Sequence, residues 1–165
     1  MARVRDDQPL VPSILDRLLD DQPDVAVDTR QSRSQLLRQL KASIRRDLEN
    51  LLNTRSSLQT YHPGLKELEE SLINYGLPDV VGAGLMTHDD RDRFRELVEA
   101  VIRRNEPRFQ KVSVHLLSND DKFDRTLRFR IDALMYAHPD PEPLVFDSLL
   151  HPVTATFDVA NEEGR

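Results

Sequence analysis

The chain contains no cysteine and no tryptophan, and only 5% of its 165 residues are aromatic. Without cysteine it can form no disulfide bond, use no thiolate nucleophile and bind no metal through thiolates. Proteins that bind single-stranded nucleic acid stack bases on aromatic side chains. They also need cations for the phosphate backbone, whereas this chain has a net charge of −6. These shortages argue against thiol chemistry and against nucleic acid as a partner.

Long apolar runs are missing as well. No stretch approaches the roughly 18 apolar residues of a membrane-spanning helix, and residues 1–7 lead into no signal-peptide core. With 38% apolar and 32% charged residues, the composition is that of a folded domain rather than of a disordered chain. We therefore expect a cytoplasmic protein. The length suits one domain, because a domain of about 150 residues is common.

The spacing of apolar residues along the sequence indicates how the chain is organised into an arm, a domain and a tail. Residues 1–12 carry two prolines and little pattern, so we expect a flexible N-terminal arm there. We expect a single α+β domain over residues 13–160 and a flexible tail over 161–165. The organisation predicted for the domain is N-terminal helices packed on one face of a small, mainly three-stranded antiparallel sheet.

Helix starts are marked by three capping pairs: Ser13 with Asp16, Ser32 with Gln35, and Thr87 with Asp90. Apolar residues follow each pair at three- and four-residue steps, and the second run predicts the longest helix. A further helix is expected from Pro63 to Gly76, with four residues facing the core. Those residues are Leu65, Leu68, Leu72 and Tyr75.

A basic stripe is expected on the solvent side of the longest helix. It consists of Arg38, Lys41, Arg45 and Arg46. Two interpretations stay open: a solvated face balanced by neighbouring acids, or a docking face for an acidic partner.

From Phe109 the apolar period changes from 3.6 to 2. Alternation predicts strands around residues 112–116, 127–133 and 153–159, which suits an antiparallel meander covered by helices on one side. Residues 145–152 stay ambiguous between a strand and a short helical turn.

The search for catalytic chemistry finds little. The five histidines are too scattered for a helical zinc site, and Gly82 with Gly84 lacks the third glycine of a dinucleotide-binding loop. Glycoside hydrolysis needs two carboxylates, and the best pair is Glu70 with Asp79. Leu85 occupies the position where the threonine of a phage-type lysozyme would follow. We therefore expect no catalytic residue, no metal and no cofactor, and predict that the protein is not an enzyme.

Five short strings carry a resemblance that runs from about Ser13 to Val159. They are SILDRL at 13–18, SIRRDLENLLNTR at 43–55, YGLPD at 75–79, IRRNEPR at 102–108 and FRIDAL at 129–134. In this order they resemble TssE, a family of baseplate subunits in bacterial type VI secretion systems. That family is typified by a small wedge protein of contractile phage tails.

The resemblance implies a structural component that joins the wedge complex to the contractile sheath and helps to start sheath polymerisation. It implies TssF and TssG as wedge partners, TssB and TssC as sheath partners, and a cytoplasmic place in the baseplate near the inner membrane. It also assigns partner contacts to Glu106, Pro107 and Arg108. The same three residues could instead form a helix stop with a local ion pair at the surface.

Two other functions stay open at this point. Some relatives of the same fold are anti-adaptors, which bind a response-regulator adaptor and protect a stress sigma factor from proteolysis. A peptidoglycan hydrolase that uses Glu70 and Asp79 is a less favoured alternative. A further hypothesis concerns the open edges of the sheet, where a partner strand could add through backbone hydrogen bonds.

Overall fold

A computed structural model describes residues 13–18, 32–56, 64–69, 71–78, 87–118, 126–137, 140–151 and 154–161. The predicted arm at 1–12, most of the predicted tail, the Glu70/Asp79 pair and the Gly82/Gly84 pair lie outside these residues. The helices are α1 (Ile14–Leu18), α2 (Arg33–Asn53), α3 (Lys66–Glu69), the 3₁₀ helix η1 (Leu72–Asn74) and α4 (His88–Asn105). The strands are β1 (Phe109–Leu117), β2 (Leu127–Met135), β3 (Glu142–His151) and β4 (Thr156–Asn161).

The strands form one antiparallel meander in the order β1-β2-β3-β4. The predicted α+β class and the meander are therefore confirmed, but the sheet has four strands and not three. The additional strand is β3, which contains most of the segment that the sequence left ambiguous. Val145 and Leu149 lie on its open face, so apolar residues there blur the alternation that marks a half-buried strand. Pairing with β2 and β4 on either side makes this segment a central strand.

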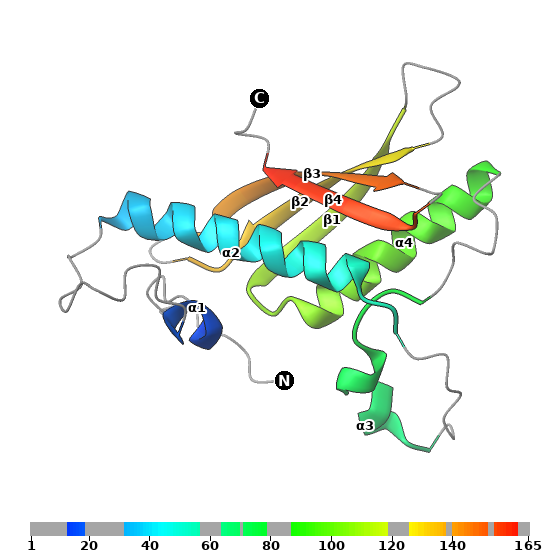
Figure 1. The fold of residues 1–165 in the computed structure, drawn as a ribbon, viewed down its shortest axis with the longest axis horizontal. Coiled ribbons are helices and arrows are strands. Elements are labelled where there is room, and N and C mark those ends of the chain that lie inside the picture. Colours follow the sequence, from blue (N-terminus) through cyan, green and yellow to red (C-terminus); the bar gives the residue numbers. More distant parts are fainter. Residues whose placement is uncertain are drawn as a thin grey trace.

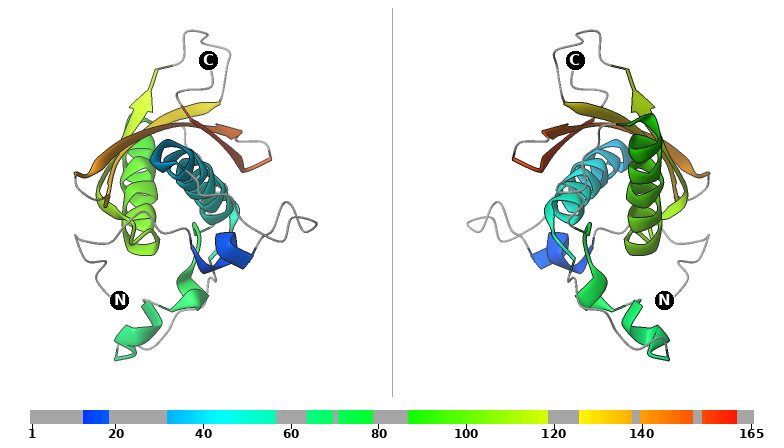
Figure 2. Two further views of the ribbon diagram at one scale, coloured as in Figure 1. Left: turned by 90° about the vertical axis from the view of Figure 1, so that its left-hand side faces the viewer. Right: turned by 90° about the vertical axis from the view of Figure 1, so that its right-hand side faces the viewer.

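Two long helices cover one face of the sheet, and the other face carries no helix in the described part of the chain (Figures 1 and 2). Helix α2 packs along β4, and α4 packs along β1. Between the layers, Phe94 of α4 contacts Phe129 of β2 and Phe157 of β4, with ring centroids 5.8 and 6.3 Å away. This aromatic cluster lies in a core of aliphatic side chains from both layers.

All three predicted capping pairs form. The hydroxyl of Ser13 accepts from the Asp16 amide at 3.1 Å. Complete capping boxes join Ser32 with Gln35 at the start of α2, and Thr87 with Asp90 at the start of α4. Such contacts satisfy amides that have no partner within the helix, so the local sequence marks these three starts.

The helix predicted from Pro63 to Gly76 is wrong in its continuity and in most of its buried face, although Tyr75 does pack against the core. The described residues form the short α3 and η1 instead, and Leu72 is 88% exposed. Leu65 and Ile73 are also exposed. The Ser71 hydroxyl donates to the Leu68 carbonyl at 2.8 Å, a local bond that competes with helical hydrogen bonding at the break.

The chain then approaches the end of α2 through Gly76, whose φ is +100°. A Cβ at this position would lie 2.3 Å from the Thr54 carbonyl oxygen, so the approach requires glycine. Beyond it, Leu77 is fully buried, and its amide donates to that same oxygen at 2.9 Å.

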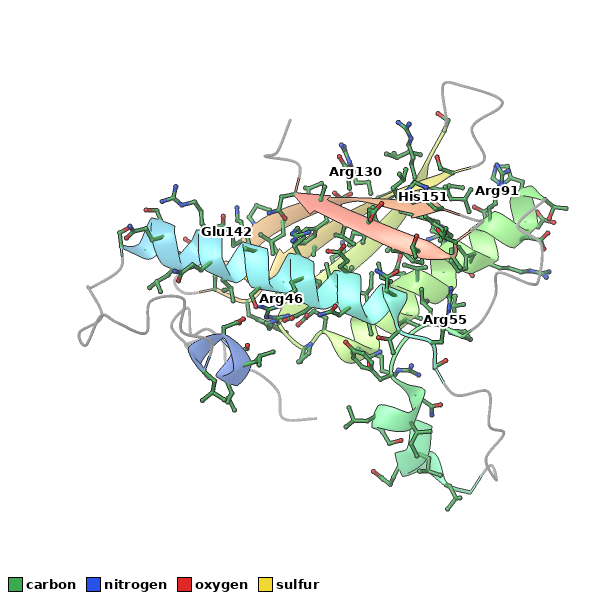
Figure 3. All side chains as sticks on the ribbon, viewed as in Figure 1. Arg46, Arg55, Arg91, Arg130, Glu142 and His151 are labelled. Carbon is green, nitrogen blue, oxygen red and sulfur yellow. The ribbon has the colours of Figure 1, made fainter. Side chains whose placement is uncertain are left out.

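The basic stripe predicted on the solvent side of α2 is largely used inside the molecule. Lys41 pairs with Glu142 of β3 at 3.5 Å, Arg45 donates to the Val159 carbonyl at 3.0 Å, and Arg46 pairs with Asp16 of α1 at 2.7 Å. Figure 3 labels Arg46 at the side of α2 that carries α1. None of the helices in the described ranges is long and apolar enough to cross a membrane.

Candidate partner-binding corner

Helix α4 runs into strand β1 through Glu106, Pro107 and Arg108, the residues assigned to partner binding by the resemblance. The Glu106 amide still donates to the Ile102 carbonyl at 2.9 Å, and Pro107 then ends the helix because it has no amide hydrogen. The Arg108 carbonyl accepts from the Tyr136 amide at 2.9 Å, just beyond β2. The corner is therefore tied to α4 on one side and to the sheet on the other.

The two charged residues of the corner face each other. The Arg108 Nε donates to Glu106 Oε1 at 2.6 Å, and its Nη2 donates to Glu106 Oε2. Nη2 also donates to Asp47 Oδ2 of α2, at 2.8 Å. Only 7% of the Glu106 side chain is exposed, and the Arg108 side chain is half-buried. A single guanidinium thus joins α2 to the corner between α4 and β1.

Asp47 extends this ion pair toward the N-terminus. Its Oδ1 accepts from Arg46 at 3.3 Å, and Arg46 in turn donates to Asp16 of α1 at 2.7 Å. The other oxygen of Asp16 accepts from the hydroxyl of Ser43 at 2.6 Å. A continuous polar network therefore runs from α1, across α2, to the Glu106–Arg108 corner.

The pKa shifts follow from these contacts. Burial by itself lowers the pKa of Arg108, but hydrogen bonds and charges from Glu106 and Asp47 outweigh it and raise the pKa above its usual value. Burial raises the pKa of Asp16, but hydrogen bonds from Ser13, Ser43 and Arg46 lower it to well below its usual range. Both groups are therefore charged at neutral pH.

Tyr75 lies near the same network. Burial and then the negative charges of Asp47 and Glu106 raise the pKa of its hydroxyl, so the phenol is neutral at physiological pH. The neighbouring segment is tied to α4 by Arg104, which donates to the Asn74 carbonyl at 2.6 Å.

The geometry gives each residue of the corner a different position. Pro107 is exposed, whereas Glu106 is buried and Arg108 is half-buried. The predicted ion pair exists, but it is mostly buried rather than a surface pair, and it includes Asp47. Because both charges are already paired within the chain, a partner would contact Pro107 and the exposed edge of Arg108. The partner contact itself stays a prediction.

Sequence reasoning missed Asp47 and Asp16 as members of this network. Asp47 is 61 residues from Arg108, and no local spacing connects them. The only sequence signal was indirect, because the resembling strings at 13–18, 43–55 and 102–108 hold the linked residues. In the described part of the chain, no group of three or more metal-ligating side chains lies together.

The two outer strands of the sheet differ in how their backbone edges are covered. Along β4, Asn53 both donates to the Phe157 carbonyl at 2.9 Å and accepts from its amide at 2.8 Å. Arg45 donates to the Val159 carbonyl at 3.0 Å, and Arg55 donates at 2.8 Å to the carbonyl of Ala155, the residue just before β4. Along β1, only Val114 has side-chain partners in the described residues: Glu99 at 3.2 Å on its amide and Arg95 at 3.4 Å on its carbonyl.

These features define a two-layer α+β domain built on an antiparallel meander. Its corner between α4 and β1 is held by the ion pairs of Arg108, and one sheet face carries no helix in the described ranges. A family model, described as the baseplate wedge protein gp25, matches residues 38–140. The chain belongs to this family, which confirms the family-level resemblance drawn from the sequence.

Comparison with other proteins adds two findings. One solved structure that matches is described as the baseplate complex from the type VI secretion system. The identity is 17% and the TM-score 0.46, over 69% of this chain and 96% of that one. Among curated proteins, none is significantly similar in sequence.

Proposed function

We propose that this protein is a structural subunit of a type VI secretion baseplate, where it joins the wedge complex to the contractile sheath and helps to start sheath polymerisation. The observation that carries the proposal is membership of the baseplate wedge family over residues 38–140, a range that includes the corner and the first two strands. The proposed role is non-catalytic, and the protein would act in the cytoplasm at the inner membrane.

The ion-paired corner formed by Glu106, Pro107 and Arg108 supports a role in assembly. A subunit that transmits force between a wedge and a sheath needs rigid joints between its own layers. Arg108 connects α2, α4 and β1 through paired and mostly buried charges, whose hydrogen bonds are stronger than neutral ones. Pro107 then lies exposed on a rigid support, where we place the contact with the wedge subunits TssF and TssG.

The sheet supports the second half of the proposal. An antiparallel sheet with an uncovered face and an available edge can accept an extended segment from another chain. We propose that the sheath subunits TssB and TssC use this sheet as the template for the first ring. Backbone hydrogen bonds would supply affinity, and side chains would supply the register.

The test is recovery of partners from the native bacterium through a tag placed after Arg165, followed by mass spectrometry. We expect wedge and sheath polypeptides to co-purify with the tagged protein. Pro107→Arg should reduce recovery of wedge polypeptides by at least about tenfold, because it adds bulk and charge at an exposed contact. Gln39→Arg, on an exposed part of α2, is the matched control and should retain them.

Other outcomes would contradict the proposal. Recovery of a response-regulator adaptor in place of wedge polypeptides would support the anti-adaptor alternative. Release of glycan fragments from purified cell walls by the isolated protein would instead require catalysis. Equal recovery of wedge polypeptides with Pro107→Arg and with the control would remove the corner from the interface while leaving the baseplate role intact.

A further inference from the structure

Helix α1 is attached to α2 through a single acidic side chain. Asp16 Oδ1 accepts from Arg46 at 2.7 Å, and its Oδ2 accepts from the hydroxyl of Ser43 at 2.6 Å. The apolar side chains of Ile14 and Leu18 are 78% and 76% exposed, so they add little to this attachment. How firmly α1 is held therefore depends on how fully Arg46 serves Asp16.

Arg46 is shared between two acids. Its Nη2 donates to Asp16 at 2.7 Å and to Asp47 Oδ1 at the longer distance of 3.3 Å. The other oxygen of Asp47 accepts from Arg108 at 2.8 Å, which balances its charge. If Asp47 lost Arg108, its unbalanced charge would attract Arg46 and repel Asp16. The attachment of α1 is therefore linked to Arg108 at the corner between α4 and β1.

Arg108 can bind one more acid than the chain supplies. Its Nε and Nη2 are bonded to Glu106 and Asp47, whereas Nη1 is buried and has no hydrogen-bond partner among the described residues. A buried donor without a partner costs free energy, which a carboxylate from outside the chain would recover. The Arg108 side chain is 23% exposed, and it adjoins the exposed Pro107. An external carboxylate there would compete with Asp47 for the guanidinium.

The position of α1 allows it to leave without disturbing the core. In Figures 1 and 2, α1 lies beside α2 on the side away from the sheet. The corner also keeps its shape, because Glu106 is bonded to the guanidinium at both Nε and Nη2. Loss of the Asp47 contact would therefore change the attachment of α1 before it changes the packing of α4 on the sheet.

We propose that α1 is a releasable helix controlled from the corner. A partner carboxylate that binds Arg108 leaves Asp47 unbalanced, Asp47 draws Arg46 away from Asp16, and α1 detaches from α2. Because coupling between two sites is reciprocal, an attached α1 also weakens the binding of that carboxylate. The inference rests on the proposed function for the partner at the corner, whereas the coupling is a property of the isolated chain.

The absence of cysteine from the chain allows α1 opening to be measured by thiol labelling. Ser43 is 6% exposed, and its hydroxyl contacts Asp16. In purified full-length protein with Ser43→Cys, the labelling rate at position 43 therefore reports detachment of α1. Amide exchange over Ile14–Leu18, measured with Ser43 unchanged, should rank the variants in the same order.

Charge variants should change the labelling rate in opposite directions. Arg108→Met should speed labelling about threefold, because Asp47 then competes for Arg46. Asp47→Asn should slow it about threefold, because Arg46 then serves Asp16 alone. Arg45→Met is the matched control: it removes a positive charge next to Arg46 in sequence, but Arg45 bonds a β4 carbonyl and lies outside the network. Its labelling rate should stay unchanged.

A second pair of variants imitates the partner carboxylate. Pro107→Glu and Pro107→Gln both remove the proline, and only the first places a negative charge beside Arg108. We expect Pro107→Glu to be labelled about threefold faster than Pro107→Gln, since the added carboxylate competes with Asp47.

The outcomes separate this inference from the proposed function. Faster labelling in both Arg108→Met and Asp47→Asn would overturn the coupling, because α1 would then respond to lost contacts and not to charge. Equal rates for the two Pro107 variants would overturn its control from the corner. Either failure leaves the baseplate role intact, since the measurements use the isolated protein. Failure to recover wedge polypeptides would refute the proposed function, and the labelling rates would still decide the coupling.

Discussion

Helices α4 and α1 have the same kind of pattern in the sequence and opposite positions in the fold. Both begin at a capping pair and carry apolar residues at three- and four-residue steps. In α4 those residues are buried against the sheet, with Val98 and Ile102 almost completely covered. In α1, Ile14 and Leu18 are 78% and 76% exposed. The apolar spacing therefore identifies a helix without saying whether its apolar face lies in the core.

The difference has a physical cause. Helix α4 has 18 residues and lies along a strand that it can cover for most of its length. Helix α1 has five residues, too few to be stable without tertiary contacts, and polar contacts hold it on the far side of α2. Its apolar side chains point away from the core, and α3 with η1 repeats this arrangement.

The sharpest test of the comparison removes one apolar side chain from each region. Phe129→Ala should lower the free energy of unfolding by about 4 kcal/mol, because it opens a cavity between Phe94 and Phe157. Leu72→Ala should change it by less than about 0.5 kcal/mol, since the side chain is already in water. Urea unfolding measures both, and a similar loss in the two variants would mean that η1 is packed.

A change in the corner at Glu106 should have the next largest effect on the free energy of unfolding. Glu106→Gln should lower the free energy of unfolding by about 3 kcal/mol, because it leaves the half-buried Arg108 without a neutralising partner on one side. Asp92→Asn alters an exposed hydrogen bond with His88 on α4 and should cost less than about 1 kcal/mol. Equal, small losses in thermal or urea unfolding would show that the corner pair is solvated like a surface pair.

Gly76 tests the connection between the exposed segment α3–η1 and the buried end of α2. Gly76→Ala should cost about 1–3 kcal/mol, because it combines positive φ with a clash against Thr54. Gly76→Asn distinguishes the two causes, since asparagine tolerates the left-handed region but keeps the Cβ. If urea unfolding shows that Gly76→Asn keeps most of the stability that Gly76→Ala loses, the close approach to Thr54 is not the main constraint.

The smallest expected effect concerns α1. Asp16→Asn should weaken its attachment to α2 by about 1 kcal/mol at neutral pH, measured by amide exchange over Ile14–Leu18. The pKa of Asp16 is lower in the folded protein than in the unfolded chain, where it is about 3.9. The carboxylate therefore stabilises the folded state fully above about pH 3.9. This stabilisation is lost as the pH falls through the pKa of the folded state. The difference between wild type and variant should therefore persist from pH 7 to about 5 and shrink in acid. A difference between wild type and variant that grows in acid would contradict the stabilising role of the ionised Asp16.

Much of the fold was predictable from local pattern. The three capping pairs place the starts of α1, α2 and α4, and Pro107 ends α4 because proline cannot continue the hydrogen-bond ladder. Alternation in period 2 identified β1, β2 and β4. The same method failed for β3, whose apolar residues occur on both faces, and for the segment before Gly76, whose apolar spacing did not lead to burial.

The candidate site was predictable only in part. Glu106, Pro107 and Arg108 were named by resemblance, and their nearness in sequence made an ion pair plausible. The third charge, Asp47, comes from a helix 61 residues earlier and could not be inferred from spacing. The roles of Asn53, Arg45 and Arg55 on the β4 edge were hidden for the same reason, since each reaches a residue at least 100 positions away.

The sequence by itself determined what depends on neighbours along the chain: where α1, α2 and α4 start, where α4 ends, the alternation of β1, β2 and β4, that thiol chemistry is impossible, and to which family the chain belongs. The tertiary structure decided which apolar faces are buried, which charges are paired and which backbone groups at the sheet edges have side-chain partners. These properties depend on contacts between segments distant in sequence, because a side chain is buried or paired only once another element lies against it.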